Sequence, residues 1–192
     1  SSDLVATRHG FSREDCDRYA ALSQSRALAA RTAGMPRSMV AVRDAQGNTL
    51  LDHDENIRAN NTLEKLAALR TVYEDGANGL DAWGLAREPE LDAIQHVHTA
   101  GNAPCMADGA AAVLVGSAAT AKRLGLPTRA RILAHADACV PLTQTGAVDA
   151  TRKALAKAGL TVADIDLWEV RDSFAAITLH YIRSLDIALE KF

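Results

Sequence analysis

The sequence predicts an α/β protein. Short apolar runs of strand length alternate with segments whose apolar residues recur at helical spacing, and turn-forming residues separate the two kinds of segment. The chain has 192 residues, of which 48% are hydrophobic and 23% are charged. This composition is that of a globular protein with a substantial core, and the length fits one domain or one and a fraction.

Several segments carry helix signals. The clearest begins at Ser12, where Ser-Arg-Glu-Asp resembles a capping box with Asp15 in place of the usual Glu or Gln, and it ends before Gly34 and Pro36. The other predicted helices are 62–69 with Thr62 as N-cap, 117–125, 147–158 closed by Gly159, and 174–187.

Strand signals lie between these helices. The continuous apolar run 110–115 (AAAVLV) is typical of a buried central strand. Residues 74–90 are rich in Gly, Asp and Glu and lack a steady period, so they are predicted to be a surface loop near a domain boundary. The remaining predicted strands are 39–42, 49–51, 94–99, 130–134 and 165–170.

Charge and cysteine content narrow the function classes. The net charge of −3 gives no basic signal for nucleic acid or an anionic membrane, and no run is apolar enough to span a bilayer. The first residues lack a signal peptide and an initiator Met, so a processed or trimmed N-terminus is expected. Cys16, Cys105 and Cys139 form no C-x-x-C pair and are odd in number, which predicts reduced thiols and a cytoplasmic location.

Four blocks of sequence, in order and spread over nearly the whole chain, resemble the thiolase family. They are GFSRED at 10–15, DENIR at 54–58 with TLEKLAAL at 62–69, TAGN at 99–102 with DGAAAVL at 108–114, and KAL, AGL and DIDLWE between 153 and 169.

The resemblance implies a partial thiolase-like layered α/β fold. Thiolases have two similar halves, with a loop domain inserted in the first half. Residues 1–94 then correspond to part of the loop domain, 95–127 to the return into the N-terminal half, and 128–192 to the beginning of the C-terminal half.

The resemblance also implies an acyltransferase that moves acyl groups between a cysteine and coenzyme A, as in fatty acid β-oxidation, and that forms a homo-oligomer (dimer or tetramer). Such chemistry needs a thiolate nucleophile, a group that moves a proton, and oxyanion holes. In thiolases the nucleophile lies upstream of the blocks seen here, and a Gly-His-Pro motif and a second cysteine lie downstream. These motifs are not in the 192 residues, so this chain alone is expected to be inactive.

One catalytic position of the family falls within the chain. Thiolases usually carry Asn-Glu-Ala-Phe where residues 171–174 read Arg-Asp-Ser-Phe, and the family's Asn positions an oxyanion-hole water. The form His-Asp-Cys-Phe of sterol-carrier-type thiolases is closer in its Asp and Phe. Because Arg cannot accept a hydrogen bond, Arg171 either stabilises an enolate directly, blocks the pocket, or forms a surface ion pair.

The resemblance places three side chains along coenzyme A. Arg58 aligns with an Arg that contacts the adenine-nucleotide end, and a guanidinium suits phosphate and purine contacts. Lys65 stands at a small polar ligand contact, and Tyr73 stands where an aromatic packs beside the pantetheine.

The loop 100–109 is expected near the pantetheine arm, beginning at Ala100. Pro104 replaces a Ser that contacts coenzyme A, and Cys105 replaces a Gly. Asn102 either braces the active-site loops or only satisfies the backbone of a structural turn.

The sequence disfavours two other kinds of site. His96 and His98 share one face of a predicted strand, but no third ligand is evident, so no metal site is predicted. Cys105 near these histidines lacks an orienting carboxylate placed by motif, which argues against a Cys–His nucleophile.

Two functions compete with catalysis. Arg171, Pro104 and Cys105 favour a thiolase-like protein that binds acyl-CoA or a partner without chemistry. The other is a structural module, for which the run 110–115, in a sheet whose other strands are largely absent, predicts instability of the isolated chain.

Overall fold

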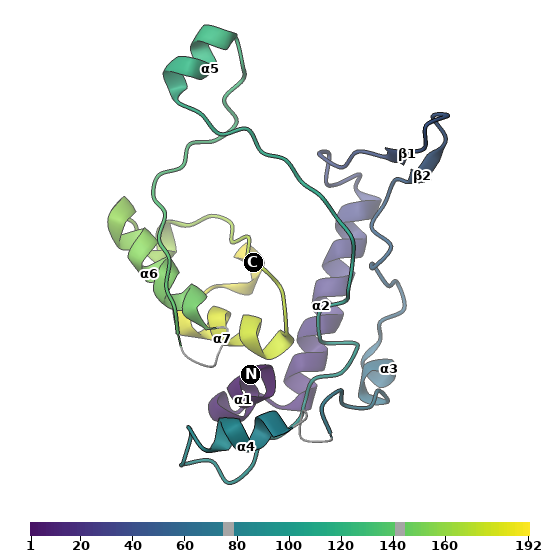
Figure 1. Cartoon of the computed structure of the whole chain (residues 1–192), viewed down its shortest axis with the longest axis vertical. Helices are drawn as coiled ribbons and strands as arrows, with labels where there is room; N and C mark the ends of the chain where they lie inside the picture. Colours follow the sequence, from purple (N-terminus) through teal and green to yellow (C-terminus); the bar gives the residue numbers. More distant parts are fainter. Residues whose placement is uncertain (75–78, 141–144) are drawn as a thin grey trace.

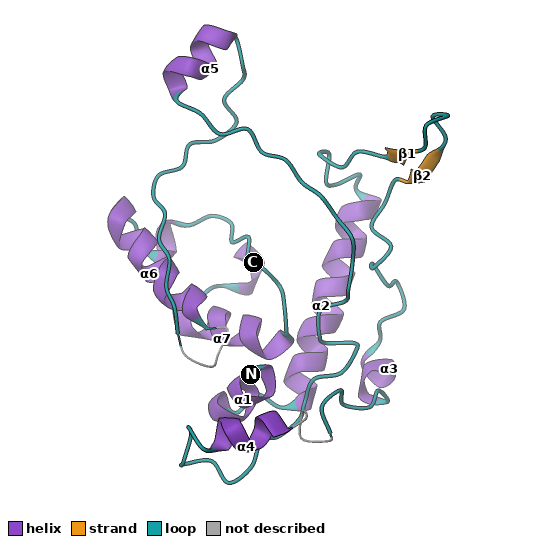
Figure 2. Ribbon diagram, in the orientation of Figure 1, coloured by secondary structure: helices purple, strands orange, loops and turns teal. Residues whose placement is uncertain are grey.

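A computed structural model describes residues 1–74, 79–140 and 145–192 (Figure 1). These residues form helices joined by long loops, with one small sheet (Figure 2). None of the helices there is long and apolar enough to cross a membrane. The helices are α1 (Ser2–His9), α2 (Arg13–Thr32), α3 (Leu63–Ala67), α4 (Leu80–Leu85), α5 (Ala118–Leu124), α6 (Gly146–Ala158) and α7 (Ala175–Leu185), with 3₁₀ turns η2 (Val162–Asp164) and η3 (Leu189–Lys191).

The capping signals are confirmed. Ser12 and Asp15 form the predicted capping box of α2, with the Ser12 side chain accepting from the Asp15 N–H and the Asp15 carboxylate accepting from the Ser12 N–H. Thr62 and Ser117 cap α3 and α5 in the same way through their hydroxyls. The predicted helices 147–158 and 174–187 are α6 and α7, and Gly159 ends α6 with a φ of 68°.

Two helices have no clear signal in the sequence. The prediction that 74–90 is a surface loop is wrong at α4, and α1 was not predicted. Neither helix has a side-chain cap, and both are short, so packing must supply their stability. Leu4 of α1 is buried, and Gly84 of α4 lies against Leu4 and Ile94 with little room for a side chain.

The core lies around α7. Figure 1 shows α1, α2 and α6 gathered about this helix, and all three contact it. From α7, Ala176, Tyr181 and Leu185 are buried against Cys16 of α2 and Val148 of α6 in one apolar cluster. The first turn of α7, from Ala175 to Thr178, is therefore buried in the core.

The small sheet pairs β1 (Val42–Arg43) with β2 (Thr49–Leu51) in antiparallel fashion. The strand predicted at 49–51 is confirmed, whereas the one predicted at 39–42 is displaced toward Arg43. The turn between them is held by Asp44, whose Oδ1 accepts from the N–H groups of Gln46 and Asn48.

Four strand predictions are wrong: 94–99, 110–115, 130–134 and 165–170 are irregular. A strand needs a neighbour for its N–H and C=O groups, and the described residues offer these segments no continuous ladder, only an isolated bridge between Thr71 and Thr99 and single bonds such as that from the Trp168 N–H to the Lys191 carbonyl. The run 110–115 is also not buried, since Val113 is 86% and Leu114 83% exposed. An apolar run predicts burial but does not supply the partner strand.

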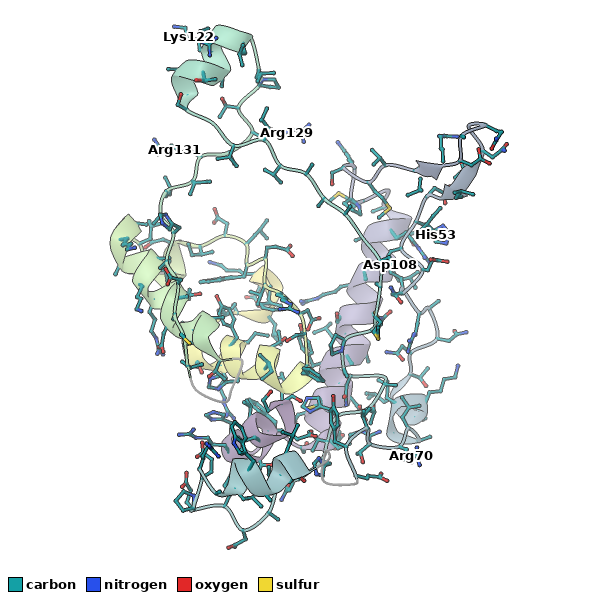
Figure 3. All side chains as sticks on the ribbon, viewed as in Figure 1. His53, Arg70, Asp108, Lys122, Arg129 and Arg131 are labelled. Carbon is teal, nitrogen blue, oxygen red and sulfur yellow. The ribbon has the colours of Figure 1, made fainter. Side chains whose placement is uncertain are left out.

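Residues 103–140 form a long arm that carries α5 away from the other helices (Figure 1). Figure 3 shows Lys122, Arg129 and Arg131 on this arm, with their side chains away from the helical body. The arm adds little to the core, because its apolar side chains face solvent in the described structure.

A buried polar network fastens the segment 97–102 to α2. Asp17, which is 3% exposed, accepts from Arg13 Nε and from Asn102 Nδ2, each at 2.8 Å. The side-chain oxygen Oδ1 of Asn102 accepts from the Thr99 N–H at 2.8 Å. Asn102 thus satisfies the backbone of a turn, as predicted, and also ties that turn to Asp17 of α2.

We predict that Asn102→Ala lowers the free energy of unfolding by about 3 kcal/mol, because it leaves a buried carboxylate oxygen and a buried N–H without partners. Urea unfolding of the longest native form of the protein measures this. The matched control Asn60→Ala lies at an exposed position and should change stability by less than about 0.5 kcal/mol. Equal effects of the two substitutions would contradict the role of the network.

We predict that the 192-residue chain by itself aggregates and melts without a cooperative transition, because apolar side chains of the arm are in water. Light scattering and calorimetry measure this. A Val113→Lys, Leu114→Glu double variant should scatter less light while its far-UV helix signal is unchanged. A monomeric, cooperative melt of the unaltered chain would contradict the prediction.

Candidate functional site

The segment 171–174 leads directly into α7, and the first free N–H groups of that helix are bound by the segment 97–102. The Ala175 N–H donates to the Asn102 carbonyl at 3.1 Å, and the Ala176 N–H donates to His98 Nε2 at 3.3 Å. Helix N-termini leave such donors without partners inside the helix. The position at which α7 begins is therefore set by two residues about 75 positions earlier in the chain.

Asp172 gives the segment 171–174 a second attachment. Its carboxylate accepts from Ser23 Oγ of α2 at 2.9 Å and from Thr178 Oγ1 of α7 at 3.1 Å. Tyr19 also approaches it: burial, and then the charge of Asp172, raise the pKa of the Tyr19 hydroxyl. Hydroxyls from two helices thus hold the residue next to Arg171.

Arg171 is exposed and lines a cavity of about 270 Å³ between α6 and α7. Ser173, His180 and Tyr181 line the same cavity. Within the described residues Arg171 forms no ion pair, which disfavours the reading that it serves a surface salt bridge. Its guanidinium is a donor-only cation at the wall of a pocket, where it can bind an anion or an oxyanion.

The residues predicted to contact coenzyme A are spread over the molecule. Arg58 lines an open groove of about 540 Å³ along α2, together with Gln24 and Thr32. Its backbone N–H donates to Gln24 Oε1 at 2.7 Å, which fixes the chain at the mouth of the groove. Lys65 is exposed on α3 and lines none of the cavities described here.

Tyr73 is half-buried and lines a third cavity of about 360 Å³, with Trp83, His96 and Phe174. Phe174 belongs to the segment 171–174, so this segment lies between the cavity of Tyr73 and the cavity of Arg171. Ala100 and Pro104 are exposed and line neither. The structure therefore brings Tyr73 near the segment 171–174, whereas Arg58, Lys65, Ala100 and Pro104 line neither of the two cavities beside that segment.

Gly101 explains why the loop after Thr99 approaches α3 so closely. A Cβ on Gly101 would overlap the side chains of Leu66 and Leu69. Only glycine allows the backbone to lie this close to the helix without moving those side chains. Gly101 therefore serves packing against Leu66 of α3 and against Leu69 in this structure.

A charged cluster joins α1 to the segment 95–98. Asp3 Oδ1 accepts from the backbone N–H groups of Val97 and His98 and lies 2.6 Å from His98 Nδ1. Its other oxygen lies 2.9 Å from His96 Nδ1, and His96 Nε2 lies 2.7 Å from Asp81 Oδ2. Within the described residues no group of three or more His, Cys, Asp or Glu side chains is arranged to hold a metal ion.

Burial and hydrogen bonding oppose each other in this cluster. Burial raises the pKa of Asp3, but hydrogen bonds from His98 and His96 outweigh it and lower the pKa from 3.8 to about 2. Burial lowers the pKa of His96, but hydrogen bonds to Asp3 and Asp81 outweigh it and raise that pKa above 6.5. The cluster is therefore built around ionised Asp3.

No cysteine of the described residues forms a Cys–His pair. Cys16 is fully buried, and burial followed by the charge of Asp17 raises its pKa to about 12, so its thiol stays protonated. Cys105 and Cys139 are exposed, and no histidine of the described part of the chain donates to or accepts from either one. The Cys–His pair weighed for Cys105 is not formed.

Sequence reasoning missed Asp3, because α1 itself was not predicted. It also missed Tyr19 and Ser23 as partners of Asp172. For the buried network around Asp17, the sequence did carry a signal. Arg13 and Asp17 stand four residues apart on a predicted helix, which is the spacing of an ion pair. Nothing local to Asp3 shows that it meets residues more than 90 positions later.

The pKa shifts predict how stability depends on pH. Because the folded pKa of Asp3 lies below 3.8, its contribution is present above about pH 4 and is lost as pH falls toward 2. Because the folded pKa of His96 lies above 6.5, its contribution is present below that value and is lost as pH rises through the raised pKa.

We therefore expect the contribution of the Asp3–His96 pair to the free energy of unfolding of the longest native form to be greatest between about pH 4 and 6.5 and to fall on both sides of that window. Urea unfolding across this range measures it. Asp81→Asn removes one partner of His96 and should flatten the alkaline side only. An unchanged alkaline slope in that variant would contradict the assignment to His96.

Comparison with known proteins gives a consistent result. The N-terminal domain of thiolase matches residues 1–80, and the C-terminal domain of thiolase matches residues 126–192. The 3-ketoacyl-CoA thiolase of Colwellia psychrerythraea is 40% identical over 193 residues, which cover 97% of this chain and 45% of that protein. The corresponding protein of Shewanella denitrificans is 39% identical over 200 residues, covering 100% and 47%.

Comparison with solved structures points to the same family. The crystal structure of human mitochondrial 3-ketoacyl-CoA thiolase in complex with CoA superposes with a TM-score of 0.83 at 35% identity, covering 99% of this chain and 44% of that one. A second crystal structure of the human mitochondrial enzyme gives a TM-score of 0.81 at 34% identity. The chain spans about half the length of the curated relatives it matches. It belongs to the thiolase family and has a partial thiolase-like α/β fold.

Proposed function

We propose that this chain is part of an acyl-CoA thiolase that transfers an acyl group between an enzyme cysteine and coenzyme A, cleaving or forming a 3-ketoacyl-CoA. The observation that carries the proposal is the match of 97–100% of the chain to proteins named 3-ketoacyl-CoA thiolase. β-Oxidation of fatty acids is the pathway that these names favour. The nucleophilic cysteine and the histidine belong to segments other than these 192 residues.

Within that enzyme we assign the segment 171–174 to the oxyanion site. It is held at Asp172 and at the start of α7, so it is preorganised before a ligand arrives. Arg171 lines the adjoining cavity and carries N–H donors for the oxygen of an enolate. A cation beside a pocket stabilises negative charge that develops there.

We assign the groove of Arg58 to the nucleotide end of coenzyme A. The groove is open and about 540 Å³ in volume, and a guanidinium stands at its wall. Arginine binds phosphate and purine faces well. Lys65, Tyr73, Ala100 and Pro104 are retained as proposed coenzyme A contacts on the resemblance alone.

We further propose the division into a partial loop domain (1–94), a return segment (95–127) and the beginning of the C-terminal half (128–192). The match to the C-terminal domain of thiolase begins at residue 126, next to the second boundary. A cytoplasmic location and a homo-oligomer are proposed for the complete protein, the first because its three cysteines here are free thiols. Acyl-CoA is the proposed partner, without nucleic acid or membrane.

The proposal predicts that the longest native form of the protein cleaves a 3-ketoacyl-CoA when free coenzyme A is added. Arg171→Ala should lower kcat by about 100-fold with a small change in KM, because one donor to the oxyanion is lost. Loss of the 3-ketoacyl-CoA absorbance measures both constants. Arg129→Ala, on the exposed arm, is the matched control and should leave both constants unchanged (Figure 3).

Two outcomes count against this assignment. Absence of turnover in the unaltered protein, with coenzyme A binding retained, favours the non-catalytic acyl-CoA-binding function that Arg171, Pro104 and Cys105 allow. A rise in kcat for Arg171→Asn, together with no loss for Arg171→Ala, shows instead that the Arg171 side chain obstructs the pocket.

A further inference from the structure

His98 is the most enclosed histidine that the structure describes. It is fully buried, and each of its ring nitrogens has one partner. Nδ1 lies 2.6 Å from Asp3 Oδ1, and Nε2 lies 3.3 Å from the backbone N of Ala176. The ring also meets Phe174 edge-on, with centroids 5.3 Å apart and planes at 79°.

These partners determine the tautomer. A backbone N–H can only donate, so the Nε2 atom that faces Ala176 must carry a lone pair. A carboxylate can only accept, so Nδ1 must carry the proton and donate to Asp3. The ring of His98 is therefore the Nδ1–H form, and a proton on Nε2 would oppose the Ala176 N–H.

The ring of His96, two residues earlier, carries its protons differently. Both ring nitrogens of His96 face carboxylates, one from Asp3 and one from Asp81, so both must donate and the ring is an imidazolium. Asp3 thus accepts from two histidines in different protonation states, with one oxygen for each. The negative charge of Asp3 is compensated by His96, which leaves His98 free to act as an acceptor toward α7.

The Nε2 acceptor of His98 faces the start of α7, next to the segment 171–174. Ala176 lies in the first turn of α7, immediately after the segment 171–174, and Phe174 is the N-cap residue of that helix. His98 therefore contacts Phe174 of this segment through its ring, and it binds the helix start just after the segment through a hydrogen bond to Ala176. Arg171 is only three residues before Phe174, so these contacts bear on where Arg171 lies.

We propose that His98, held by Asp3 in the tautomer with an unprotonated Nε2, is a positioning residue that fixes the segment 171–174 and thereby the place of the Arg171 guanidinium. Its effect on turnover rests on the proposed function. Its effect on the structure of the segment does not.

The experiment compares three variants of the longest native form with the unaltered protein. His98→Phe keeps a ring but removes both hydrogen bonds, and His98→Gln restores an acceptor oxygen at the reach of Nε2. His53→Phe is the matched control, because His53 also pairs with a neighbouring Asp, at 2.8 Å, but lies 55% exposed and away from α7 (Figure 3).

The first readout needs no activity. Nitrogen-15 NMR of the labelled histidines should show Nδ1 of His98 protonated and Nε2 bare, with both nitrogens of His96 protonated near pH 6. Hydrogen exchange of the Ala176 amide should accelerate by about 10-fold or more in His98→Phe and return toward the original rate in His98→Gln. A proton on Nε2 of His98, or an unchanged Ala176 rate in His98→Phe, would overturn the proposal.

The second readout is thiolysis. His98→Phe should lower kcat by about 10- to 100-fold with KM nearly constant, since displacement of a catalytic group costs rate more than binding. His98→Gln should recover most of the loss, and His53→Phe should change neither constant. Equal loss in the Phe and Gln variants, or none in either, overturns the positioning role. Absence of turnover in the unaltered protein counts against the proposed function alone, because the NMR readout still decides on His98.

Discussion

The segment 97–102 depends on two buried carboxylates, and the position of α7 depends on that segment. Asp3 of α1 binds its first half, and Asp17 of α2 binds Asn102 in its second half. Neither carboxylate is more than 5% exposed. A buried carboxylate is tolerated only when its oxygens are fully paired. The polar atoms of the segment are therefore obligatory partners, and the helix start that they bind is held by the same constraint.

This arrangement differs from a salt bridge placed for stability. Buried ion pairs often gain little over apolar residues of similar size, because desolvation offsets the attraction between charges. Their geometry is nevertheless demanding, since removal of one partner leaves a buried charge unpaired. At Asp3 and Asp17 that demand is met by backbone N–H groups, an amide, an Arg and two histidines. The result specifies where three helices meet the segment 97–102.

Most of the predicted helices form, but few of the predicted strands do, for a physical reason. A helix closes its hydrogen bonds locally and is announced by caps such as Ser12 with Asp15. A strand needs a partner that may lie anywhere in a chain, so the apolar run 110–115 indicated burial without identifying a neighbour. The same asymmetry explains the site. Arg171 could be found by resemblance to a motif, whereas Asp3 and His98 become partners only through contacts that span more than 75 residues.

The arrangement around Asp172 bears on how an arginine can stand where most thiolases have an asparagine. An adjacent acid would be expected to neutralise Arg171, but Asp172 already accepts from Ser23 and Thr178 and lies beside the Tyr19 hydroxyl. Within the described residues the guanidinium is left without a carboxylate partner, at the wall of the cavity between α6 and α7. A guanidinium N–H that donates to a water lone pair leaves both hydrogens of that water for an oxyanion. In the oxyanion site proposed above, Arg171 would therefore donate in the place of the family's Asn and add a positive charge.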